Sequence, residues 1–212
     1  MSGRIITLAQ QKGGSGKTTV ASHLAIAHAL RGLSVAILDV DPQGSLGEWF
    51  EARETTLGPE GTGLTFRTAS GWGARREARA LARDHAIVVV DTPPKSDMEA
   101  RPAIEAADLV CIPVQPTPVD LWATQATLEM LSREKRPGLM ILNRAVPRAA
   151  LTQEISDVVR GLPVPTARTT LGSRVAFAAA MGKGLSVEET EPGSRSAEEI
   201  AALIAEVMAA GA

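Results

Sequence analysis

A glycine-rich run near the N-terminus constrains the fold of this chain more than any other feature. The apolar residues 4–9 lead into KGGSGKTT at residues 12–19, and apolar side chains then recur at helical spacing over residues 17–31. Glycines let a loop curl with its backbone N–H groups pointing inward, and the start of the following helix adds positive potential. A strand, a glycine loop and a helix in this order predict a phosphate-binding loop. The residues expected to form it are Gly13, Gly14, Ser15, Gly16, Lys17, Thr18 and Thr19.

The rest of the chain repeats this alternation of short apolar runs and helical patterns. Runs that are apolar throughout are typical of strands buried on both faces, and strand–helix–strand alternation gives right-handed crossovers between parallel strands. For a chain of 212 residues, we therefore predict one α/β domain over residues 1–212, with a twisted, mostly parallel central sheet and helices on both faces. A loop is predicted at residues 55–63. Further strands are predicted at residues 34–39, 64–68, 86–91, 109–114 and 138–143, and further helices at residues 75–84, 98–106, 118–133, 152–160 and 197–208.

Composition excludes several classes of protein. The single cysteine, Cys111, excludes a disulfide framework and a cysteine-rich metal site within one chain, and we expect it in the core. The absence of tyrosine excludes tyrosine autophosphorylation. No apolar stretch approaches the roughly 18 residues of a membrane span, and the N-terminus has no signal-peptide pattern, so we expect a cytoplasmic protein. The three tryptophans are expected to pack inside: Trp49, Trp72 and Trp122.

The side chains of the glycine loop predict its chemistry. Lys17 can reach the β and γ phosphates of a nucleotide, and the Thr18 hydroxyl can bind Mg²⁺. Thr19 is placed to contact the α phosphate. The ordinary pattern has glycine where this chain has Gln11, and a second lysine, Lys12, follows it. Lys12 is either a solvated surface charge or a group with a specific role toward phosphate.

Three aspartates mark the ends of the second and fourth predicted strands. Asp39 and Asp41 lie two residues apart, so in an extended chain both side chains leave on one face. Such carboxylates suit Mg²⁺ or a water molecule poised for attack, and the alternative is a helix-capping aspartate with Pro42 at the first helical position. Asp91 ends the apolar run 87–90, which is where a phosphate-loop site usually carries a carboxylate that holds a metal-bound water.

In this order the motifs resemble the ParA-type partition ATPases, within the wider ParA/MinD group. That resemblance implies a P-loop NTPase fold with a deviant Walker A loop, a small form without an N-terminal helix-turn-helix domain, and ATP and Mg²⁺ as cofactors. It extends over essentially the whole chain. The matching segments are residues 12–19, 39–43, 91–94, 113–116, 141–144, 174–177 and 184–187.

The resemblance assigns roles to the matching residues of the loop. Lys17 and the amides of residues 13–17 are expected to hold the phosphates. Lys12 corresponds to the signature lysine, which reaches across a two-fold axis to the ATP of a partner subunit. Two subunits then share two nucleotides in a homodimer, and removal of the γ phosphate weakens it. The expected activity is a slow ATPase that works as a switch.

The same resemblance assigns the remaining site residues. Asp41 corresponds to the carboxylate that orients the attacking water, with Asp39 near the metal, and Asp91 holds Mg²⁺ through water together with Thr18. Asn143 corresponds to the residue that hydrogen-bonds adenine. The segment 117–120 is expected near the nucleotide and the dimer interface.

Charge is unevenly spread along the chain, although the net charge is only −2. Residues 136–183 hold seven basic and two acidic side chains, whereas residues 184–212 hold one basic and six acidic ones. The partition branch binds DNA non-specifically, and the basic segment can supply that surface, the alternative being scattered surface charge. The last helix is acidic on its polar face, which anionic lipid repels, so we expect no membrane partner. The candidate DNA-binding residues are Arg144, Arg148, Arg168, Arg174 and Lys183.

The functional prediction is a Mg²⁺-dependent ATPase that forms an ATP-sandwich dimer, binds DNA non-specifically in association with the nucleoid, and drives plasmid or chromosome partition with a ParB-like activator. One alternative is a positioning ATPase for another cargo, such as a chemoreceptor cluster or a carboxysome. A second alternative is an ATP-dependent metabolic ligase or synthetase on a similar scaffold. Lys12 and the Asp41-Pro42-Gln43 element argue against the ligase.

Overall fold

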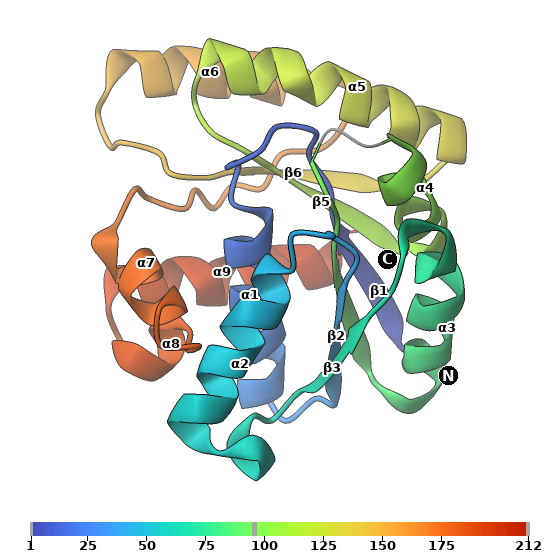
Figure 1. Ribbon diagram of the computed structural model, residues 1–212. Coiled ribbons are helices and arrows are strands. Elements are labelled where there is room, and N and C mark those ends of the chain that lie inside the picture. The colour runs from blue at the N-terminus through green and yellow to red at the C-terminus, as the bar shows by residue number, and fades with distance from the viewer. Residues whose placement is uncertain (1, 95–96, 211–212) are drawn as a thin grey trace.

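A six-stranded parallel sheet forms the centre of the computed structural model, which describes residues 2–94 and 97–210 (Figure 1). Its strand order is β3-β2-β4-β1-β5-β6, and every pair of neighbours runs parallel. The predicted α/β fold is confirmed, and each predicted strand is present with its ends shifted by at most one residue. The strands are β1 (Arg4–Leu8), β2 (Val35–Asp39), β3 (Thr65–Thr68), β4 (Ile87–Asp91), β5 (Leu109–Val114) and β6 (Gly138–Leu142).

Helices cover both faces of the sheet. In the described part of the chain these are α1 (Lys17–Leu30), α2 (Ser45–Leu57), α3 (Ala74–Asp84), α4 (Asp97–Ala106), α5 (Pro118–Glu134), α6 (Ala150–Arg160), α7 (Val175–Met181), α8 (Val187–Thr190) and α9 (Arg195–Ala209), with 3₁₀ turns η1 (Pro59–Gly61) and η2 (Gly71–Gly73). None of these helices is long and apolar enough to cross a membrane.

Alternation along the strands divides the core into two layers. Side chains such as Ile6, Ile37 and Val89 pack with α1, α2 and α9 on one face. Their neighbours in sequence pack under α3 to α6 on the other face. Because β-strand side chains alternate between faces, this is the pattern of a sheet buried on both sides. Cys111 is fully buried, as predicted.

Three predictions about local structure were wrong. Residues 55–57 belong to α2, and residues 59–61 form η1, so the predicted loop 55–63 is mostly helical. Trp72 is 86% exposed and Trp122 is 72% exposed, and of the three tryptophans only Trp49 packs in the core.

The last helix packs on the fold, as predicted. Ile200, Leu203 and Val207 of α9 lie in the core beside α1.

The parallel strands bring the predicted site residues to one edge of the sheet. Asp91 lies in register with Leu8 of β1 on one side and with Asp39 of β2 on the other. The loop after β1 therefore emerges directly beside both carboxylates. This is the crevice at the carboxyl ends of the strands where open α/β sheets bind ligands.

Candidate nucleotide site

The glycine loop between β1 and α1 adopts a backbone that only glycine allows easily. Gly14 has φ of 77° and Gly16 has φ of 96°, both in the left-handed region. A Cβ atom on Gly16 would collide with the side-chain amide of Asn143. Glycine at residue 16 is therefore required by φ and by close packing together.

Asn143 fixes this loop from the end of β6. Its side-chain nitrogen donates to the carbonyl of Ser15 at 2.8 Å, and its oxygen accepts the N–H of Arg144 at 2.9 Å. On the other side, the Gln115 side chain, just after β5, donates to the carbonyl of Gly14 at 2.6 Å. Two neighbouring strands thus clamp the loop, and the adenine contact of Asn143 stays a prediction.

Lys17, Thr18 and Asp91 form a polar cluster at the start of α1, in which Lys17 and Asp91 are buried and Thr18 is partly exposed. The Thr18 hydroxyl donates to Asp91 Oδ2 at 2.6 Å. Burial lowers the pKa of Lys17, while the charges of Asp91 and Asp41 act in the opposite direction. Burial raises the pKa of Asp91 to about 7, against the hydrogen bond from Thr18 and the charge of Lys17. Lys17 and Asp91 are therefore both desolvated at the start of α1, and the charge of each acts on the pKa of the other.

The same cluster fits a divalent cation. Asp91 Oδ1 is buried and has no hydrogen-bond partner among the described residues, so it presents a free oxygen next to the Thr18 hydroxyl. Mg²⁺ is usually held by one or two protein oxygens together with substrate phosphates, and not by a full protein cage. Consistently, no group of three or more His, Cys, Asp or Glu side chains in the described chain is arranged to hold a metal by itself.

Asp39 and Asp41 serve different geometric roles. Asp39 is 2% exposed, and its two oxygens accept the backbone N–H groups of Asp41 at 3.0 Å and Gly47 at 3.1 Å. Burial raises its pKa against those backbone bonds. Asp41 is less buried, accepts the N–H of Gln43, and lines the cleft with the glycine loop. Asp39 thus fixes the turn between β2 and α2, and its predicted contact with the metal stays a prediction. No helix begins at Pro42, since α2 begins at Ser45.

Lys12 lies at the outer side of the loop, against α5. Its ammonium group is 3.2 Å from Asp120 Oδ2, with the lysine side chain 31% exposed and Asp120 only 1% exposed. The Thr117 hydroxyl donates to the same oxygen, and Thr117 also accepts the N–H of Asp120 as the N-cap of α5. Lys12 is therefore held within its own chain by a carboxylate that α5 positions. The segment 117–120 therefore contacts the loop through Asp120, and its expected place near the nucleotide and a dimer interface stays a prediction.

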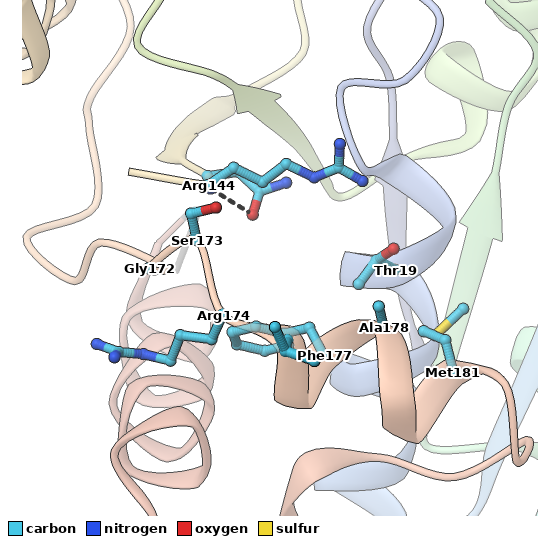
Figure 2. A pocket seen from close by; sticks show the side chains of 10 residues that line it. Thr19, Arg144, Gly172, Ser173, Arg174, Phe177, Ala178 and Met181 are labelled. Atoms are coloured by element: carbon cyan, nitrogen blue, oxygen red, sulfur yellow. Dashed lines mark hydrogen bonds between the residues drawn. The ribbon is translucent and has the colours of Figure 1, made fainter. Parts of the chain in front are cut away.

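An open cleft of about 500 Å³ continues from the loop to α7. Figure 2 shows Phe177, Ala178 and Met181 of α7 facing Thr19 of α1, with the Arg144 side chain extending over the cleft toward the loop. A second hollow, of about 470 Å³, lies over the glycine loop. The two share Thr19, Arg144 and Met181, so they form one continuous surface.

The five predicted DNA-binding residues do not form one free basic surface. Arg174 points away from the cleft in Figure 2 and pairs with Glu199 of α9 at 2.6 Å. Arg168 lies 3.8 Å from Glu206 of α9. Arg144 belongs to the cleft described above. Arg148 and Lys183 are exposed and pair with no carboxylate of the described residues. Acidic side chains of residues 184–212 thus neutralise part of the basic charge of residues 136–183.

Sequence reasoning missed the contacts that position the loop. Asp120 lies 108 residues after Lys12, the residue that it contacts. Gln115 lies 101 residues after Gly14, to which it donates a hydrogen bond. Helix-capping chemistry at Thr117 was a signal for the start of α5, with an aspartate three residues on. Nothing local indicated that this aspartate binds Lys12.

The fold and the loop together define the class of protein. A parallel α/β sheet with a glycine loop, a buried lysine and a strand-end carboxylate is a nucleotide-binding P-loop domain. Over residues 6–187 the chain matches the family described as CbiA, the CobQ/CobB/MinD/ParA nucleotide binding domain. The protein belongs to this family.

Individual relatives share most of their length with this chain. It is 32% identical over 211 residues to maintenance of carboxysome distribution protein A from Halothiobacillus neapolitanus, covering 96% of this chain and 95% of that protein. It is 30% identical over 241 residues to the chromosome-partitioning ATPase Soj from Thermus thermophilus, covering 97% and 96%. The septum site-determining protein MinD from Pyrococcus horikoshii, solved in complex with Mg-ADP, has the same fold, with a TM-score of 0.81 and 19% identity over 96% of this chain and 95% of that one.

Proposed function

We propose that this chain is a Mg²⁺-dependent ATPase of the ParA type, which dimerises around ATP and uses that dimer to position a cargo on DNA. The observation that carries the proposal is the placement of two lysines on one loop. Lys17 is 7% exposed inside the site, whereas Lys12 lies at its rim beside Asp120. A rim lysine can leave its own chain to meet the nucleotide of a second copy, and a buried one cannot.

The geometry supports the following roles within one subunit. Lys17 and the loop amides bind the phosphates, and the Thr18 hydroxyl with Asp91 Oδ1 would hold Mg²⁺, which supplies charge neutralisation for the transferred phosphoryl group. Asp41, on the wall of the same cleft, orients the attacking water. Asn143 and Phe177 border the part of the cleft that fits the base.

The trans role of Lys12 supplies the switch. Charge from the partner subunit on the phosphates acts as an arginine finger does, whose typical worth is roughly 10³–10⁵ in rate. Hydrolysis removes the γ phosphate and with it the attraction between subunits. DNA is bound by phosphate contacts, for which Arg148 and Lys183 are the exposed candidates of the C-terminal segment.

The cargo has two candidates, each favoured by a relative of similar identity. The Soj relative, named a chromosome-partitioning ATPase, favours a chromosome as the cargo. The relative named for maintenance of carboxysome distribution favours a carboxysome. For a DNA cargo we expect a ParB-like activator. Both cargos use the same ATP-dependent dimer, so the test of the biochemistry does not depend on the choice.

Light scattering after size exclusion tests the proposal, with ATP, ADP or no nucleotide present. We expect the wild type to dimerise with ATP alone, and Lys12→Ala to stay monomeric in all three conditions. Lys135→Gln, which removes a lysine at the end of α5, is the matched control and dimerises as the wild type does. A Lys12→Ala chain that dimerises equally well refutes the trans role, and a wild type whose size ignores nucleotide refutes the whole proposal.

A further inference from the structure

Helix α3 carries a dense run of arginines on its exposed side. Four arginines lie within nine residues, and all four are exposed. At about 100° per helical residue, they fall within an arc of about 100°. Glu77 and Asp84 lie on the far side of the exposed surface, and Ala78 and Leu81 face the sheet. The four arginines are Arg75, Arg76, Arg79 and Arg83.

Most of this charge has no counter-ion. Arg75 pairs with Glu105 of α4 at 3.1 Å. Arg76, Arg79 and Arg83, which we call the α3 arginine stripe, form no ion pair with any carboxylate in residues 2–94 and 97–210. The stripe lies on the opposite face of the sheet from α9, whose acidic side chains neutralise Arg168 and Arg174 (Figure 1).

The spacing of the stripe suits a nucleic acid backbone. From Arg76 to Arg83 the helix advances about 10 Å, at about 1.5 Å per residue. Successive phosphates of one strand of duplex DNA are spaced about 3.4 Å along its axis, so the stripe is about as long as three of them. Guanidinium groups bind phosphate oxygens through two parallel hydrogen bonds, and on an exposed helix each has the freedom to do so.

We propose that the α3 arginine stripe is a docking surface for the phosphate backbone of duplex DNA, separate from the basic residues of the C-terminal segment. This rests on the proposed function, in which the ATP-bound dimer binds DNA. The dimer presents two such stripes, which makes contact with DNA stronger for the dimer than for the monomer. Contacts of this kind are independent of sequence and weaken steeply with salt.

Duplex DNA fits the stripe better than a lipid surface does. A helix that lies in a membrane interface inserts an apolar face among the lipids. The apolar face of α3, with Ala74, Ala78 and Leu81, is already buried against the sheet. Trp72, 86% exposed just before the helix, is the reason that the test includes vesicles.

The test compares two triple variants that lose the same charge. The first is Arg76→Gln/Arg79→Gln/Arg83→Gln. The control is Arg133→Gln/Arg160→Gln/Arg195→Gln, three exposed arginines that already pair with a carboxylate. Fluorescence anisotropy of a 30-base-pair duplex of arbitrary sequence is measured with Mg-ATP at several salt concentrations. Anionic phosphatidylglycerol vesicles form a parallel arm.

For the stripe variant we expect the slope of log K against log salt to flatten by roughly 3 per chain, since each lost phosphate contact removes about 0.9. Arg79→Gln alone is expected to flatten it by about 1, and the control triple to change it by less. ATP-dependent sizing and thermal unfolding of each variant should match the wild type, because these side chains are exposed.

Three other results of these binding measurements would each contradict a different part of the proposal. A stripe variant with the wild-type slope overturns the docking surface while leaving the proposed function intact. A wild type that binds no DNA with ATP overturns DNA binding in the proposed function, and the stripe with it. A stripe variant that keeps DNA binding and loses vesicle binding makes α3 a lipid contact instead.

Discussion

Lys12 and Lys17 belong to one loop, five residues apart, yet they lie in contrasting surroundings. Lys17 begins α1, is 7% exposed, and senses the charges of Asp91 and Asp41 in the interior of the site. Lys12 is 31% exposed and contacts Asp120, a carboxylate of another helix. In our proposal, the side chain of Lys17 binds only the nucleotide of its own chain. Lys12 can exchange its partner, because the ion pair with Asp120 lies at the rim where water or a second subunit can compete.

The contrast also distinguishes two kinds of neutralisation. Of the carboxylates whose charge acts on Lys17, Asp91 belongs to the proposed metal site and Asp41 to the proposed position of the attacking water. Both would therefore interact with Mg²⁺, water or nucleotide when these bind. The carboxylate beside Lys12 has no metal function in our proposal, and one of its oxygens, Oδ1, is buried without a hydrogen-bond partner among the described residues. Asp120 Oδ2 is shared by the Thr117 hydroxyl and Lys12, so Asp120 holds Lys12 as a counter-charge that dimerisation must displace in our proposal.

The largest effect is expected from Lys17→Ala. It removes the one buried cation among the loop residues, and hydrogen bonds to charged groups typically contribute about 1.5–3 kcal/mol, which corresponds to roughly 10–150-fold in affinity. We expect isothermal titration calorimetry to show a loss of affinity of about 10–150-fold for ATP and for ADP. Lys12→Ala is the comparison, and it should keep ADP affinity close to wild type. Equal losses in both variants would show that the two lysines share one role.

A smaller effect is expected from Asp120→Asn, which keeps the shape of the side chain and removes its charge. Without its counter-charge Lys12 is released from its own chain, so the dimer should form at a lower ATP concentration. Part-exposed ion pairs contribute about 1 kcal/mol, which gives a shift of roughly 5-fold. Light scattering over an ATP titration measures it, with Glu129→Gln on the exposed side of α5 as control. A higher ATP requirement would mean that Asp120 holds Lys12 in the orientation that the partner needs.

The fold could be predicted because its signals are local. Apolar runs at β1, β4 and β5 indicate strands buried on both faces, and the glycine run fixes the first turn. Helix α2 was missed because its buried side is sparse, and part of that side is Arg53, a charged residue that sequence patterns assign to solvent. In the structure Arg53 is 4% exposed and pairs with Glu189 at 2.7 Å, a partner from α8.

The site could be predicted only where its residues lie in short, continuous sequence motifs. The loop and the strand-end aspartates lie in short motifs, so their meeting follows from parallel strands. Asp39 accepts two backbone N–H groups in the turn between β2 and α2, and the sequence does not reveal these contacts.

The sum of charges over each segment of the sequence also missed contacts in the fold. In that sum Arg174 is an unpaired cation, because its partner Glu199 belongs to the next segment. The arginines of α3 were overlooked because acidic residues elsewhere among the first 135 residues offset their charge.

The smallest effect is expected from Glu199→Gln, which breaks the ion pair between Glu199 and Arg174. It extends the comparison of the two lysines to a cation of the C-terminal segment. Glu199 accepts two bonds from the guanidinium of Arg174 and one from the N–H of Gly172. Glu199→Gln keeps an acceptor for Gly172 and removes the ion pairs with Arg174 and with Arg195. The free energy of unfolding should therefore fall by about 1 kcal/mol and Tm by about 2–4 °C. Calorimetry measures this, with Glu198→Gln on the same helix as control. If Arg174 serves only to hold the C-terminal segment to α9, releasing it leaves the salt dependence of DNA binding nearly unchanged. A steeper salt dependence in Glu199→Gln would instead show that Arg174 binds DNA once its ion pair with Glu199 is broken. Glu199 would then restrain Arg174 as Asp120 restrains Lys12 in our proposal.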